Sequence, residues 1–512
     1  MNREMRKTLV FVVAAALMSG AAIIPMADRA SRPEAFDDQG RKFFDDFDPN
    51  AATTLEVIDY DPATAQVLPF KVTNKAGRWV IPSHYDYPAD AKQRLVDTAT
   101  GVIGLTKDSI RSDRVDDHEA FGVIDPLDTK ATSLKGIGKR VTLKDGSEKV
   151  LADFIIGKEV KDHPDQRYVR VPGQKRSYGV NVKVDLSTRF ADWIETNLLK
   201  LTATAVRRIV IDHQGFDPNG GPLPGDKIVL ERKDSSSPWT VSDLAEGKEP
   251  NTETLLALSN ALGDLKIAGI RPKPEGLTAD LKEAPGEVKP STRQSWLSMV
   301  NKGFYLTRDG LFSNKGVVTI ATDEGVVYTL RYGEVVFATG NELSAGTEPT
   351  KQAKGLAKAT KDPAKGAEGT SEGRYLFATA SFDPALLPPP KPSADEDDKF
   401  PDDPFSREPG EAASLVTESP AAKAKAEKAR AERDRQVAEG QKRAKELSDR
   451  FAAWYYVTPG DNYRTIVQDR ANLVREKGSK PAAAPGRPGG RPGLPGGFPG
   501  GPGGLPFGPD GI

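Results

Sequence analysis

An internal repeat limits the possible folds of this chain more than any other sequence feature. A short stretch around Trp79 resembles one around Trp239, and each is typical of a β-strand whose aromatic side chain faces a core. An apolar pattern with helical spacing follows each tryptophan and ends at Leu105 or Leu265. The separation from tryptophan to leucine is 26 residues in both copies. The equal spacing predicts two copies of one module.

The middle of each copy is predicted to contain a β-hairpin. Each predicted helix leads to a glycine-centred loop, and the hairpins then span residues 141–157 and 318–333. We expect Gly146 and Gly325 to form the turns, in Asp-Gly and Glu-Gly corners, because glycine adopts positive φ at little cost.

Each copy is expected to end in a third strand, marked by Tyr168 or Tyr375, and in a closing helix at residues 189–193 or 450–454. The second copy has longer connections, with an excess of 31 residues before Tyr375 and of 54 residues after it. The predicted fold class is α+β: two tandem repeats of a module with an antiparallel sheet and helices on one face.

The N-terminus carries basic residues followed by an apolar run at residues 8–24, which Pro25 ends. A helix of this length rises about 25 Å, at the short end of what spans a bilayer core. A cleaved signal peptide and a retained anchor are both consistent with the run. We favour the retained anchor because residues 26–30 form a poor cleavage site. The positive-inside rule then predicts a single-pass inner-membrane protein, held through residues 8–24, with most of the chain in the periplasm.

Composition shifts divide the rest of the chain. A charged helix over residues 421–448 lacks a sustained apolar seam, which favours a solvated single helix over a coiled coil. Residues 481–512 are almost wholly glycine and proline without collagen spacing, which predicts disorder. The predicted segments are the anchor or signal (1–27), an acidic linker (28–54), the first repeat (55–201), the second repeat (202–390), a Pro/acid-rich linker (391–420), a charged helix that continues into the closing helix of the second repeat (421–457), a C-terminal extension (458–480) and the disordered tail (481–512).

Composition also argues against several classes of function. The net charge of −1 provides no field for nucleic acid, and the absence of cysteine excludes thiolate metal sites and cysteine nucleophiles. Asp46, Asp48 and Asn50 begin like a calcium loop, but Ala51 and Val57 stand where glycine and glutamate are needed. We therefore predict no catalytic, cofactor-binding or metal-binding residue, no cofactor and no nucleic-acid partner, and we expect that the protein is not an enzyme.

Four patterns give the chain a family resemblance: GRW at residues 77–79 with its helix, GFYLT at 303–307, GVVYTLRYG at 325–333 and FAAWYYV at 451–457. Together they resemble the domain-of-unknown-function family 4340, in the larger form of planctomycete-type bacteria, over about residues 55–390 and 450–467. The resemblance implies an N-terminal membrane segment, repeated α+β modules and an association with ABC-type export systems related to gliding-motility transporters. It implies no catalytic residues.

These observations predict a non-enzymatic, membrane-anchored extracytoplasmic protein. Its expected role is that of an accessory or scaffold subunit of an envelope complex, with ABC-type transporter subunits as partners. The alternative is a membrane-tethered module that binds a ligand or glycan, whose identity the sequence leaves open. A hydrolase would need polar groups that converge in a pocket.

Overall fold

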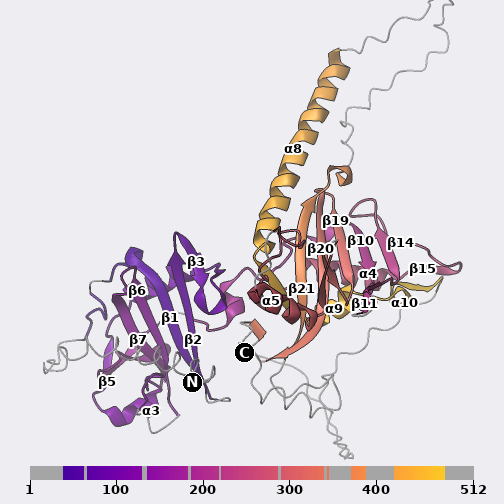
Figure 1. The fold of residues 1–512 in the computed structure, drawn as a ribbon. Coiled ribbons are helices and arrows are strands. Elements are labelled where there is room, and N and C mark those ends of the chain that lie inside the picture. The colour runs from indigo at the N-terminus through magenta and orange to yellow at the C-terminus, as the bar shows by residue number, and fades with distance from the viewer. Residues whose placement is uncertain are drawn as a thin grey trace, which may run out of the picture.

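The computed structural model describes residues 39–45, 47–62, 66–129, 135–182, 186–217, 221–285, 290–308, 310–338, 343–344, 371–387 and 420–478. Its strands form two large antiparallel sheets with helices packed against them (Figure 1), which confirms the α+β class. The predicted anchor at residues 8–24 and the predicted tail at 481–512 lie outside these residues. Within them, no helix combines the length and apolar character needed to cross a bilayer.

The first sheet has nine strands in the order β4-β3-β2-β1-β6-β7-β8-β9-β5. Its strands are β1 (Ala52–Asp61), β2 (Gln66–Lys75), β3 (Arg78–Ile81), β4 (Tyr87–Pro88), β5 (Ser109–Ser112), β6 (Lys139–Asp145), β7 (Val150–Val160), β8 (His163–Arg170) and β9 (Ser177–Asn181).

The second sheet has eight strands in the order β14-β13-β10-β19-β20-β21-β22-β16. Its strands are β10 (Val206–Asp212), β13 (Lys227–Glu231), β14 (Thr240–Val241), β16 (Gly269–Pro272), β19 (Val317–Thr322), β20 (Val326–Ala338), β21 (Ser371–Phe382) and β22 (Trp454–Pro459). Three two-stranded pairs accompany it: β11 (Gly215–Asp217) with β12 (Gly221–Leu223), β15 (Lys248–Pro250) with β23 (Val474–Glu476), and β17 (Phe304–Thr307) with β18 (Gly310–Ser313).

The helices of the described residues are α2 (Lys92–Ile103), α3 (His118–Phe121), α4 (Thr252–Gly263), α5 (Pro290–Val300), α8 (Pro420–Phe451), α9 (Gly460–Ile466) and α10 (Arg470–Leu473). Short 3₁₀ turns are η1 (Pro49–Ala51), η2 (Pro82–His84), η3 (Val115–Asp117), η4 (Phe190–Trp193), η5 (Ala203–Ala205) and η6 (Pro384–Leu386).

The two sheets share one strand order. If the extra edge strand β4 is set aside and the strands of each sheet are counted along the chain, both sheets read 3-2-1-5-6-7-8-4. The fourth strand, β5 or β16, lies at the far edge beside the eighth in each case. The helix between the third and fourth strands is α2 in the first sheet and α4 in the second, and each has 12 residues. The sequence repeat predicted both helices.

The strand registers agree as closely as the order. The pairing of β1 with β6 shifts between Ala52 and Thr54, and the pairing of β10 with β19 shifts at the corresponding positions, Val206 and Arg208. A second shared irregularity lies near Gly157 in β7 and Gly333 in β20. A Cβ atom at either glycine would overlap with a main-chain carbonyl oxygen. Both glycines therefore allow a neighbouring segment to approach the bulged strand closely.

Helices do not lie on one face only of the second sheet, contrary to the prediction. Leu376 and Ala378 of β21 pack in the main core with side chains of α4 and α8. The intervening Phe377 packs on the opposite face with Met299 of α5 and with the β17–β18 hairpin. Side chains alternate between faces along a strand, so β21 contributes to both layers. Both faces of β21 are buried, so its sequence does not show the apolar and polar alternation that would mark a solvated face.

The predicted closing helices are wrong. Residues 190–193 form the 3₁₀ turn η4, and residues 454–459 form strand β22 inside the second sheet. Helix α8 ends at Phe451 and does not continue to residue 457. The equivalent of β22 is β9, because Tyr178 and Tyr456 occupy the same register position beside β8 and β21. Both tyrosines are buried. The FA-x-W sequences of residues 190–193 and 451–454 are similar, but they do not occupy equivalent positions in the two sheets.

One predicted turn differs as well. The hairpin β6–β7 turns with positive φ at Glu148, not at Gly146, because its loop is longer than a two-residue corner. The turn of β19–β20 does place Gly325 at positive φ, as predicted. Asp145 caps the first turn by accepting hydrogen bonds from the main-chain N–H groups of Ser147 and Lys149.

Buried contacts join the two sheets. The His84 ring stacks on Phe190 with centroids 4.0 Å apart, and its Nε2 lies 3.0 Å from the Ser344 hydroxyl. Tyr87 packs edge-on against Trp454, at the start of β22. Burial, with a smaller contribution from the positive charge of Arg271, lowers the pKa of His84 to about 4. The imidazole is therefore neutral at pH 7.

Candidate functional site

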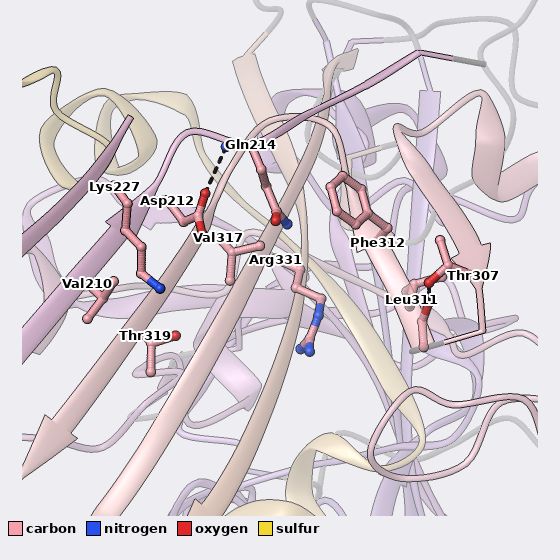
Figure 2. Close-up of a pocket in the computed structure, with 11 residues that line it drawn as sticks. Val210, Asp212, Gln214, Lys227, Thr307, Leu311, Phe312, Val317, Thr319 and Arg331 are labelled. Atoms are coloured by element: carbon pink, nitrogen blue, oxygen red, sulfur yellow. Dashed lines mark hydrogen bonds between the residues drawn. The ribbon is translucent and has the colours of Figure 1, made fainter. Parts of the chain in front are cut away.

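A groove of about 240 Å³ lies on the outer face of the second sheet. Strands β10, β19 and β20 form its floor, and the β17–β18 hairpin forms one wall (Figure 2). Alternation along the strands explains its lining: Ile209 and Leu330 point into the core, while Val210 and Arg331 point the other way. We call this space the outer-face groove.

Three charged side chains line the groove. Figure 2 shows Lys227, Arg331 and Asp212 reaching it from three different strands, with the Gln214 amide extending toward Arg331. Asp212 accepts a hydrogen bond of 3.1 Å from the Gln214 main-chain N–H, which fixes that carboxylate at the end of β10. The groove thus holds two cations and one anion.

Arg331 is the most unusual of these residues. Its Nη1 donates a hydrogen bond of 3.4 Å to the Thr379 hydroxyl, and among the described residues it forms no ion pair. Burial lowers the pKa of the guanidinium below its ordinary value, and the negative charge of Asp280 opposes this through space. Arg331 is therefore a partly desolvated cation with weak compensation.

Aromatic and aliphatic side chains form the rest of the wall. Phe312 and Leu311 line the groove from β18. Phe216 of β11 stacks on Tyr305 with centroids 4.0 Å apart and lies 5.5 Å from Phe312. All three rings are only partly buried. The groove therefore has a cationic floor and an aromatic rim.

The same location on the first sheet has a different chemistry. Arg140 of β6 forms ion pairs with Asp153 at 2.7 Å and with Asp125 at 3.0 Å. In the shared register, Val317 takes the place of Arg140 and Thr329 that of Asp153, while Arg331 stands where the first sheet has Ile155. Val210 similarly takes the place of Glu56, which pairs with Lys144 at 3.5 Å. Arg140 is thus neutralised on the outer face of the first sheet, whereas Arg331 on the second has no ion pair among the described residues.

A second hollow, of about 510 Å³, lies between α4 and the α9–α10 segment. Its polar side chains largely bond to one another: Asn251 Nδ2 donates to the Asn472 carbonyl at 3.2 Å, and Asn472 Nδ2 donates to Gln468 Oε1 at 3.0 Å. The outer-face groove is the stronger candidate, because Arg331 there has one hydrogen bond and no ion pair among the described residues.

The sequence predicted no site residue, and it missed the groove. Arg331 lies within GVVYTLRYG, one of the four patterns that carry the family resemblance. Strict alternation would have placed Arg331 opposite Leu330, but only the strand register reveals that it stands where the first sheet has Ile155, with Thr329 in place of Asp153. In the described part of the chain, no group of three or more His, Asp or Glu side chains is arranged to hold a metal ion.

Comparison with protein families gives one match. Residues 79–283 match the family described as Domain of unknown function (DUF4340). This DUF4340 domain begins in β3 of the first sheet and ends after β16 of the second, so it includes parts of both sheets. The predicted resemblance is confirmed over this stretch, and its link to transport systems stays a prediction. No curated protein and no solved structure matched the chain significantly.

Proposed function

We propose that this chain is a non-enzymatic, membrane-anchored extracytoplasmic protein that serves as an accessory or scaffold subunit of an envelope complex of the ABC transport type. The proposal places residues 8–24 in the inner membrane as an anchor and the two sheets in the periplasm. It also takes the two sheets to be tandem copies of one module, which their common strand order and bulges support.

Helix α8 is the observation that carries the scaffold proposal. Buried residues at Gly440, Ala444, Leu447 and Phe451 recur on one face and pack the last third of the helix on the second sheet. Arg433 extends the attachment by donating to the carbonyls of Pro384 and Leu387. Figure 1 shows the N-terminal part of α8 projecting away from the sheets.

The projecting part is suited to a partner rather than to the core of this chain. Lys428 and Arg430 are exposed there, and the described part of the helix before Arg433 contributes no side chain to a hydrophobic core. A long helix held rigidly at one end can present a charged surface at a distance from the sheets.

Co-purification tests this role. The full chain, extracted in detergent from its own membrane, should recover transporter-type membrane subunits. Reversing two exposed charges, Lys428→Glu with Arg430→Glu, should reduce that recovery about tenfold, because charged rim contacts set specificity. Lys445→Glu, in the docked part of α8, is the matched control and should change recovery little. Recovery of only unrelated envelope proteins would exclude the scaffold role.

A reporter fused after Ile512 tests the proposed location. A periplasm-active reporter should be active and a cytoplasm-active one silent, because the positive-inside rule exports everything after residue 24. The opposite pattern would refute membrane export of the sheets.

The second candidate function is a membrane-tethered ligand-binding module. The outer-face groove favours it, since a concave site with a few convergent polar groups and apolar walls is the usual form of a small-ligand site.

A further inference from the structure

We propose that the outer-face groove binds a small ligand through a single carboxylate, with Arg331 as its anchor and an apolar or planar ligand body against the aromatic rim. This inference deepens the second candidate function, on which it rests, and does not depend on the scaffold role of α8.

The first argument is the unused hydrogen-bonding capacity of Arg331. A guanidinium carries five N–H donors in a planar fork, and Arg331 uses one of them in a hydrogen bond of 3.4 Å. Two other arginines of low exposure differ: Arg140 has two carboxylates, and Arg170 donates to the carbonyls of Val123 and Gln174. A carboxylate matches the fork with two parallel bonds and compensates the desolvated charge.

The second argument is the charge count. Lys227 and Arg331 supply two positive charges to the lining, and Asp212 supplies one negative charge. The net charge of these three lining side chains is therefore +1, which suits a monoanion, and Asp280, which acts on Arg331 from outside the lining, disfavours a more negative ligand. A phosphate, which carries nearly two negative charges at pH 7, would bring its second charge close to Asp212.

The third argument is the wall opposite the cations. Leu311 and Phe312 both line the groove, and the stacked pair of Phe216 and Tyr305 continues the apolar surface beyond it. A planar or apolar body would be removed from water against these rings while its carboxylate reaches Arg331. The modest volume restricts the ligand to a compact molecule.

Titration calorimetry on the full chain in detergent tests the proposal with three matched probes: benzoate, its neutral analogue benzamide, and phenyl phosphate. Benzoate should bind saturably and at least about tenfold more tightly than either of the others, because only it places one negative charge on the fork. Arg331→Gln should weaken benzoate binding about tenfold or more, and Arg331→Lys less, because lysine keeps the charge but not the fork.

Arg208→Gln is the matched control. Arg208 lies on β10, two residues before the groove-lining Val210, and it pairs with Glu231 at 3.0 Å. Its loss should leave benzoate affinity within about twofold. Should Arg331→Gln fail to fold, the exposed Lys227→Gln takes its place, with an expected loss of about threefold.

Four results would overturn the inference: no benzoate binding, equal binding of benzamide, tighter binding of phenyl phosphate, or an equal loss with Arg208→Gln. No residue of helix α8 lines the groove, so these results would leave the scaffold role unaffected. Subunit recovery in the co-purification experiment would still support that role. Failure of the two proposals is thereby distinguishable.

Discussion

The two sheets have the same strand order and the same bulges, yet an arginine on the outer face of each has different partners. In the first sheet Arg140 is paired with two aspartates, whereas Arg331 in the second has no carboxylate partner among the described residues. The core-facing positions remain apolar in both, as Val141 and Val318 illustrate. Apolar core packing is therefore common to the two sheets, while the side chains on the other face of their strands differ.

The bulge glycines test the shared architecture, with the largest expected effect. Gly157→Ala and Gly333→Ala should each destabilise the fold by about 3 kcal/mol or more, because the added methyl group would overlap with main-chain atoms that cannot move aside. Gly104→Ala, where a Cβ has ordinary contacts at 3.7 Å, should cost almost nothing. Chemical denaturation of the three variants measures this. A small effect at one of the two bulges would mean that the copies are not equivalent there.

The contact between the sheets predicts a pH dependence of stability. The pKa of His84 is lowered from 6.5 to about 4, so between these values the unfolded chain binds a proton that the folded chain does not. Stability from this group is fully present above pH 6.5 and falls as the pH drops toward 4. The loss is on the order of 3 kcal/mol for such a shift.

Urea unfolding at pH 7 and pH 4.5 of the wild type and of His84→Phe measures that loss. The variant keeps a ring against Phe190 but cannot titrate, so its stability should depend less on pH. His118, whose pKa burial also lowers, is present in both proteins and cancels from the comparison. Identical pH profiles would show that His84 does not stay neutral in the folded chain.

Arginine removal gives the smallest expected effect and the most direct contrast between the outer faces. Arg140→Leu should destabilise the first sheet by about 2 kcal/mol, since it leaves Asp153 and Asp125 partly buried without their cation. Arg331→Leu should change stability by less than about 0.5 kcal/mol or increase it, because no ion pair is lost. Thermal unfolding of both variants measures the contrast, and a large loss at Arg331 would indicate a structural role for it.

Local sequence patterns were sufficient for part of this structure. The equal spacing from Trp79 to Leu105 and from Trp239 to Leu265 predicted both amphipathic helices. Both predicted hairpins are present, although their second strands continue past Gly157 and Gly333. These features depend on periodicity and on residues close in the chain, where side-chain spacing directly reports the local backbone.

Other features depended on contacts between distant segments, and only the tertiary structure decided them. Residues 454–459 have no strand partner nearby in sequence, and they become β22 because β21 and β16 flank them. The sequence by itself determined the repeated helices and hairpins. The pairing of distant strands determined which arginine is neutralised and which is left available, because a charge is compensated by its neighbours in space.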